Sequence, residues 1–159
     1  MVLIVVKHLR VPSQLLALLL GALPLGACHY EDRRLASVAV AHGTMRDFSV
    51  ALACYKEHTE GYPPQLRDLA DPPGGCPTID WLNDPRPEYP QPHHAFYDYF
   101  YTASGPDENG RFQHFGLMAS GPKSVEECDV SMSFWLDDSG VLRQAPGRSA
   151  GRDHPPVEH

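Results

Sequence analysis

Residues 35–69 read LASVAVAHGTMRDFSVALACYKEHTEGYPPQLRDL, and this stretch decides how the rest of the chain is arranged. Apolar residues recur every three or four positions, which places them on one stripe of an α-helix. A helix with one apolar stripe buries it against another element, so we expect the later part of the chain to cover it. Gly43 interrupts the helix at a cost of about 1 kcal/mol relative to alanine, which predicts a close packing partner or a bend there. The stripe consists of Leu35, Val38, Ala41, Met45, Phe48, Leu52 and Tyr55.

The long helix is expected to end at Gly61. Glycine readily adopts the left-handed conformation that closes a helix, and the pair Pro63-Pro64 prevents continuation. The same pair suits the first turn of a second, short helix, which would carry Leu66 and Leu69 inward.

The second half of the chain predicts a small antiparallel sheet. Strands are expected near residues 96–102, 112–119 and 131–136, with a short fourth strand at 141–143. Asn109-Gly110 is a strong signal for the turn between the first two strands. Alternation places the tyrosines of the first strand on one face, which we interpret as core. We therefore predict an α+β fold: a long N-terminal helix packed on a small antiparallel β-sheet, with a Pro/Gly-rich loop between them.

The loop at residues 71–92 is too rich in proline and glycine for a regular helix or an internal strand. We expect Ile79, Trp81 and Leu82 to anchor it. A bond between Cys54, near the end of the helix, and Cys76 would staple the loop to the nearest rigid element. We favour this disulfide, with Cys128 as the unpaired thiol. A Cys76–Cys128 bond, a Cys54–Cys128 bond or no bond remain alternatives.

The first 27 residues have the pattern of an export signal peptide. Lys7 and Arg10 precede an almost wholly apolar run at residues 15–20, and small residues follow at 26–27. The sequence Leu25-Gly26-Ala27-Cys28 resembles the bacterial lipobox, which implies cleavage before Cys28 and attachment of a lipid to it. Plain secretion and an uncleaved anchor are the alternatives. We assign residues 28–145 to one domain and residues 146–159, rich in Gly, Pro, Arg and His, to a solvated, disordered tail.

Charge and motifs exclude several classes of activity. The net charge of −7 argues against nucleic acid as a partner. We find no nucleophile elbow, zinc-binding pair of cysteines or phosphate loop, so we predict no enzyme activity, no cofactor and no metal. His93 and His94 are adjacent, so their side chains would point apart, as surface histidines do. His58, like the other isolated histidines, is given no role in a site. The acids at 107–108 and 137–138 suit turns better than calcium.

Several short motifs, in order, resemble those of type IV pilin-like proteins. Tyr55, the corner Gly61-Tyr62-Pro63 and the leucines that follow resemble the corner after the long pilin helix. The stretch from Phe134 to Arg143 resembles the Phe-x-x-Asp-x-x-Gly-x-Ile-Arg ending of the major pseudopilins of type II secretion. The resemblance covers roughly residues 35–143 and implies a helix on an antiparallel sheet.

One feature differs from prepilins. Prepilins are cleaved before their hydrophobic segment and keep it as the filament core, whereas here the apolar run lies before Gly26. The resemblance therefore implies a pilin-type domain delivered on a lipid anchor in a bacterial cell envelope, facing the periplasm or the exterior. We expect a non-enzymatic binding or assembly role near a secretion or surface system, with an unidentified protein partner. The alternative is a small periplasmic ligand-binding protein or an enzyme whose site is dispersed.

Overall fold

The computed structural model describes residues 25–83, 91–121, 132–147 and 149–157, with side chains described from Leu35 onward. The chain divides into two compact units, Met1–Ala36 and Ser37–His159. The packing considered below is that of the second unit. Within the described residues, no helix combines the length and the apolar character that crossing a membrane requires.

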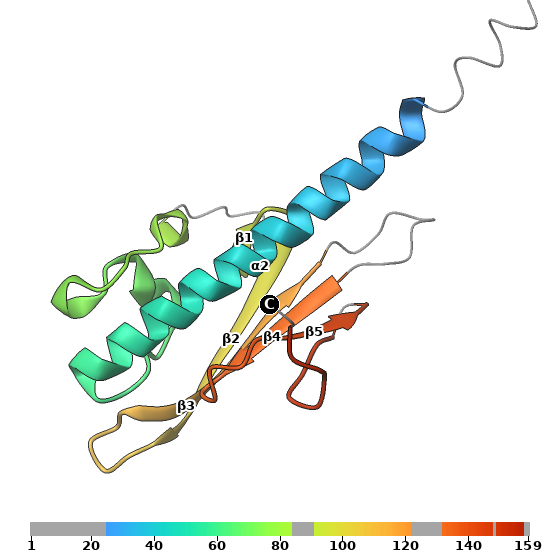
Figure 1. Cartoon of the computed structure of the whole chain (residues 1–159). Coiled ribbons are helices and arrows are strands. Elements are labelled where there is room, and N and C mark those ends of the chain that lie inside the picture. The colour runs from blue at the N-terminus through green and yellow to red at the C-terminus, as the bar shows by residue number, and fades with distance from the viewer. Residues whose placement is uncertain (1–24, 84–90, 122–131, 148, 158–159) are drawn as a thin grey trace, which may run out of the picture. The chain divides into compact units, whose positions relative to one another are not determined.

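Along the described residues, one long helix is followed by three short 3-10 helices and then by the strands (Figure 1). The five strands of this described part belong to one sheet, lie in chain order and are antiparallel to their neighbours. The predicted α+β class is confirmed. The elements are α2 (Leu25–Thr59), η1 (Leu66–Ala70), η2 (Pro73–Gly75), η3 (Asp80–Asn83), β1 (His93–His94), β2 (Tyr97–Pro106), β3 (Phe112–Ser120), β4 (Met132–Asp137) and β5 (Arg143–Pro146).

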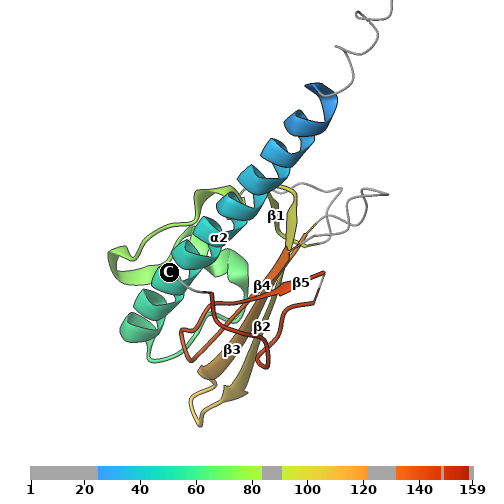
Figure 2. The same cartoon turned by 45° about the vertical axis from the view of Figure 1, so that its right-hand side comes forward.

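The apolar stripe of α2 forms the core with one face of the sheet. Met45, Phe48 and Leu52 are at most 1% exposed, and they belong to the same buried cluster as Tyr99 and Leu117 of the sheet. Figures 1 and 2 show the C-terminal part of α2 running across one face of the sheet. The predicted burial of the stripe is confirmed from Ala41 to Leu52, and Val38 and Tyr55 pack against the cluster half-buried. Leu35 is the exception: it lies before this unit and is 62% exposed.

The corner after α2 forms differently from the prediction. Glu60 takes the left-handed conformation, with φ of 62°, in place of Gly61. Gly61 is needed instead because the chain at the corner passes very close to residues 111–112. A Cβ there would lie 2.8 Å from Cβ of Arg111 and 3.2 Å from the carbonyl oxygen of Phe112. The next residue, Tyr62, donates its N–H to that same oxygen at 2.8 Å. The backbone of the corner therefore lies against the start of β3.

The short helix and its loop are held by the leucines and by the predicted anchors. The helix is a 3-10 helix that begins at Leu66, after both prolines, so the placement of the prolines in its first turn was wrong. Leu66 and Leu69 point inward as predicted, at 4% and 0% exposure. In the loop, Ile79 and Leu82 are buried, and Ile79 donates its N–H to the carbonyl of Leu69 at 2.9 Å.

The strands follow the prediction in the centre of the sheet and differ at its edges. The β2–β3 hairpin turns at residues 107–110, where Gly110 donates its N–H to the carbonyl of Asp107. The short strand β1 is an addition, paired with β2 across Ala95 and Phe96, which both have positive φ. The last strand lies at Arg143–Pro146 rather than at 141–143.

Residues 149–157 differ from the expected solvated tail. Val157 donates its N–H to the carbonyl of Leu142 at 2.8 Å, and Pro156 forms a bridge with Arg143. Ala150 is 6% exposed. Because these contacts are made mainly by the backbone, the spacing of apolar residues in the sequence does not predict them.

Candidate functional site

The predicted disulfide joins the last turns of α2 to the loop. Cys54 and Cys76 are bonded, and their Cα atoms lie 5.7 Å apart. Cys54 comes from the helix, and Cys76, which is 5% exposed, follows η2. The helix supplies a rigid base, while the loop has few apolar anchors. The bond therefore ties the loop covalently to the helix, in addition to the buried contacts of Ile79 and Leu82.

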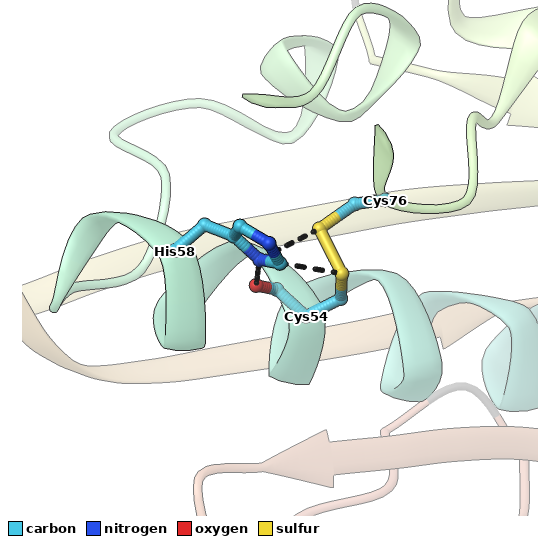
Figure 3. Close-up of side chains that lie close together, drawn as sticks. All are labelled: Cys54, His58 and Cys76. Atoms are coloured by element: carbon cyan, nitrogen blue, oxygen red, sulfur yellow. Dashed lines mark hydrogen bonds between the residues drawn. A yellow bond between two sulfur atoms is a disulfide. The ribbon is translucent and has the colours of Figure 1, made fainter. Parts of the chain in front are cut away.

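His58 lies beside this disulfide (Figure 3). It follows Cys54 by one helical turn, so both side chains leave the same face of α2. Its Nδ1 is 3.7 Å from Sγ of Cys54, 3.5 Å from Sγ of Cys76 and 3.0 Å from the carbonyl oxygen of Cys54. In the described part of the chain, these residues form a group with ligand atoms within 4.8 Å of one another. We call them the Cys–His cluster.

The imidazole of His58 lies close against Gly74 of η2. A Cβ on Gly74 would lie 2.1 Å from Cδ2 of His58, and Gly74 has φ of 70°. Glycine meets both demands, since it lacks a Cβ and tolerates positive φ. Sequence analysis gave no role to His58. The four-residue spacing from Cys54 is the signal that could have found it.

A second polar cluster centres on Asp137 at the end of β4. Its side chain is 1% exposed. Burial alone would raise its pKa, but donors from Ser139, Trp135 and Arg152 outweigh that effect and lower the pKa to about 2. Nε of Arg152 lies 2.9 Å from one carboxylate oxygen. Asp138 accepts from Arg152 at 3.3 Å and pairs with His114 at 2.8 Å. The cluster ties the C-terminal segment to the sheet.

The other candidate residues have structural partners. Asp107 accepts from the N–H groups of Asn109 and Arg111, which makes it a turn residue. His93 pairs with Asp98 at 2.8 Å, whereas the ring of His94 stacks on Trp81. The two histidines therefore contact different partners, as their adjacency predicts.

The tyrosines of β2 belong to the core, as predicted. Tyr97 and Tyr99 are at most 1% exposed, and Tyr101 is half-buried. Burial raises the pKa of the hydroxyls of Tyr99 and Tyr101. The hydroxyl of Tyr101 donates to the carbonyl of Pro63 at 2.8 Å, which ties the sheet to the corner after α2.

Among the described residues, two open grooves stand out on this unit. The first, of about 550 Å³, runs between α2 and the segment after β4. The second, of about 320 Å³, lies beside η1. No histidine, cysteine or carboxylate is among the described residues that line them. The first is lined by Met45, Arg46, Ser49, Val50, Leu136, Gly140, Val141, Leu142, Pro156 and Val157, and the second by Pro64, Gln65, Leu66, Arg67, Gln91, Pro92, Tyr99 and Tyr101.

Sequence analysis also assigned roles to two further cysteines, Cys28 and Cys128. Cys28 lies in the first turn of α2, and attachment of a lipid to it stays a prediction. Cys128, predicted as the unpaired thiol, lies outside the described residues.

No protein-family model, curated protein or solved structure matches this chain.

Proposed function

We propose that this chain is a non-enzymatic lipoprotein of a bacterial cell envelope. In this proposal Cys28 carries the lipid, and the unit from Ser37 onward is a pseudopilin-like domain. It binds a protein partner in a secretion or surface assembly.

The observation that carries the proposal is the packing of one long helix on an antiparallel sheet. The same residues that carried the resemblance hold this arrangement together. Phe134 is buried in the core, Gly61 makes the close corner, and the turn after β4 follows Asp137. A domain of this kind buries one face of its sheet against the helix, so the opposite face of the sheet can contact a partner.

The linings of the two grooves favour binding over catalysis. General acid–base catalysis needs a side chain that exchanges protons near neutral pH. The ionisable groups among the described lining residues are Arg46, Arg67, Tyr99 and Tyr101. Arginine keeps its proton in proteins, and the raised tyrosine pKa keeps both phenols protonated at neutral pH.

A row of large side chains on the sheet supplies a surface for a partner. The register places Phe100 opposite Met118, and Met118 opposite Trp135. Their side chains alternate with the buried Tyr99, Leu117 and Phe134, so they lie on the opposite face from α2. Phe100 is 39% exposed. Aromatic residues and methionine are enriched in protein interfaces, which suits this outer row (Phe100, Met118 and Trp135) to partner binding.

Replacing Cys28 with serine tests the anchor. Cys28→Ser is expected to release the chain from the membrane fraction or to stop its processing, because the acyl acceptor is gone. Cys128→Ser is the matched control and should leave attachment unchanged. Equal attachment of the wild type and Cys28→Ser, with masses that differ only by the exchange of sulfur for oxygen, would contradict the lipoprotein proposal.

Photo-crosslinking from the outer row tests the partner. A photoreactive residue at Phe100, in cells that carry the native envelope, is expected to give a discrete adduct with one protein. The control is the same residue at Asp47, which is exposed on α2. Adducts that are the same from both positions, or absent from Phe100, would contradict binding through this row.

A further inference from the structure

We propose that the Cys–His cluster binds one Zn²⁺ ion when the Cys54–Cys76 disulfide is reduced. The disulfide and the metal are then alternative ways of holding the loop to α2. This inference does not depend on the proposed anchor or on the proposed protein partner.

The ligand types and their spacing fit zinc. Zinc is held in proteins by thiolates and imidazoles, most often in a tetrahedron. With Zn–S of about 2.3 Å and Zn–N of about 2.0–2.1 Å, a tetrahedron separates a sulfur from a nitrogen ligand by about 3.5 Å. Nδ1 of His58 already lies 3.5 Å from Sγ of Cys76 and 3.7 Å from Sγ of Cys54. The nitrogen and each sulfur are therefore spaced for zinc before any metal is present.

The distance between the two sulfur atoms is the one that must change, and reduction of the disulfide permits this. The two sulfurs are bonded to each other in the disulfide and would move to about 3.8 Å apart around a tetrahedral ion. Cys54 is fixed in α2, so the movement falls on Cys76. That residue follows Gly74 and Gly75, which both have positive φ. Two consecutive glycines give this part of the loop the backbone freedom that the change needs.

His58 must also change one hydrogen bond. Nδ1 lies 3.0 Å from the carbonyl oxygen of Cys54, a distance at which it donates its proton. A metal needs the lone pair of that nitrogen, so the proton moves to Nε2 and the bond to the carbonyl is given up. The three protein ligands leave one position of the tetrahedron for water.

The chemical balance requires a reductant and releases protons. A dithiol reduces the disulfide: its two sulfurs become a disulfide, and Cys54 and Cys76 each gain a hydrogen. Binding of Zn²⁺ then forms two Zn–S bonds and one Zn–N bond and releases the two thiol protons. Zinc thus keeps the loop attached to α2 after the covalent bond is lost.

Zinc titration of the full-length chain tests this site. Cys28 and Cys128 are first replaced by serine, so that Cys54 and Cys76 are the remaining thiols. The chain is reduced with a phosphine, which takes the place of the dithiol, and Zn²⁺ is titrated in competition with a chromophoric chelator. We expect one tightly bound Zn²⁺ per reduced chain and none at this site in the oxidised chain. Bound zinc should also slow alkylation of the two thiols.

Two variants separate this site from adventitious binding. His58→Ala removes one of three ligands and should weaken zinc binding roughly 10-fold or more. Loss of a residue that only hydrogen-bonds to a zinc ligand already has an effect of about 10-fold. His114→Ala removes an exposed histidine outside the cluster and should leave the affinity unchanged. Circular dichroism of each reduced chain, with and without zinc, reports whether a loss of binding reflects unfolding.

The proposal is overturned by any of three results. The reduced chain could bind Zn²⁺ no more tightly than its Cys54→Ser/Cys76→Ser variant. The oxidised chain could bind it as tightly as the reduced chain. Finally, His58→Ala could retain the wild-type affinity while the thiols stay protected.

Discussion

Gly61 is a residue whose lack of a side chain allows two segments of backbone to lie close together. A Cβ there would meet the Cβ and backbone carbon of Arg111 and the carbonyl oxygen of Phe112, none of which can turn away as a flexible side chain can. Gly61→Ala is therefore expected to lower the free energy of unfolding by about 1–3 kcal/mol, the usual cost of overpacking. Denaturant unfolding followed by circular dichroism measures the change. A neutral Gly61→Ala variant would contradict the close corner.

Gly43 provides the matched comparison within the same helix. We expected a close packing partner or a bend there. A Cβ on Gly43 would meet nothing within 4 Å, so the packing partner was the wrong alternative. Gly43→Ala should raise the free energy of unfolding by up to about 1 kcal/mol, because alanine loses less backbone entropy in a helix. The same unfolding experiment measures this change. A Gly43→Ala variant that is less stable than the wild type would contradict the open space found around Gly43.

Asp137 links stability to pH. Its pKa in the folded chain is about 2, below its ordinary 3.8. A carboxyl with a lowered pKa stabilises the fold above its unfolded pKa, and this contribution disappears as the pH falls from about 4 to about 2. Asp137→Asn should therefore cost about 2 kcal/mol at pH 7 and much less near pH 2.

The measurement is denaturant unfolding of the wild type and Asp137→Asn at several pH values. Asp47→Asn, which changes an exposed carboxyl on α2, is the control and should track the wild type. A constant gap between Asp137→Asn and the wild type from pH 7 to pH 2 would rule out the proposed linkage.

At the scale of elements, α2 depends on its buried stripe. Phe48 is completely buried and contacts the rings of Trp81 and Tyr99. Phe48→Ala should lower the free energy of unfolding by about 3–5 kcal/mol, from lost burial and the cavity left behind. Val50, two residues away, is 59% exposed. Val50→Ala should change stability by no more than about 0.5 kcal/mol, and equal losses at both positions would contradict the packing of α2 on the sheet.

The loop between helix and sheet depends on the disulfide. Cys54 and Cys76 are separated by 22 residues, and closing a loop of this size typically contributes about 2–4 kcal/mol. The variant Cys54→Ser/Cys76→Ser should lose about that much under oxidising conditions. Cys128→Ser should lose little, since we predict that Cys128 is unpaired. If Cys128→Ser lost more stability than the double variant, this would contradict the role of the Cys54–Cys76 bond in holding the loop.

Across the whole molecule, features set by neighbours in sequence could be predicted, and features set by distant contacts could not. The stripe of α2 and the Asn109-Gly110 turn are local patterns; the stripe is confirmed from Ala41 to Leu52, and the turn is present. The role of Gly61 depends on β3, about 50 residues later, so its spacing in sequence suggested a helix cap instead. The contact of Arg152 with Asp137 likewise has no sequence signature.

The sequence predicted the two cysteines of the Cys–His cluster as a pair, but not its histidine. Cys54 and Cys76 were paired by reasoning about which element the loop needed, and the bond is present. His58 was left out because it was judged to form no short motif with acids or cysteines, although it lies one helical turn after Cys54. Its approach to Cys76 depends on the path of the loop past Gly74, which composition alone does not give.

The most direct test of the central claim is the intact mass of the protein extracted from membranes without reduction. The account predicts a chain that begins at Cys28, carries acyl groups on that residue and gains two hydrogens when the Cys54–Cys76 bond is reduced. A chain that retains residues 1–27, or one that begins at Cys28 without acyl groups, would contradict the lipid-anchored domain proposed here.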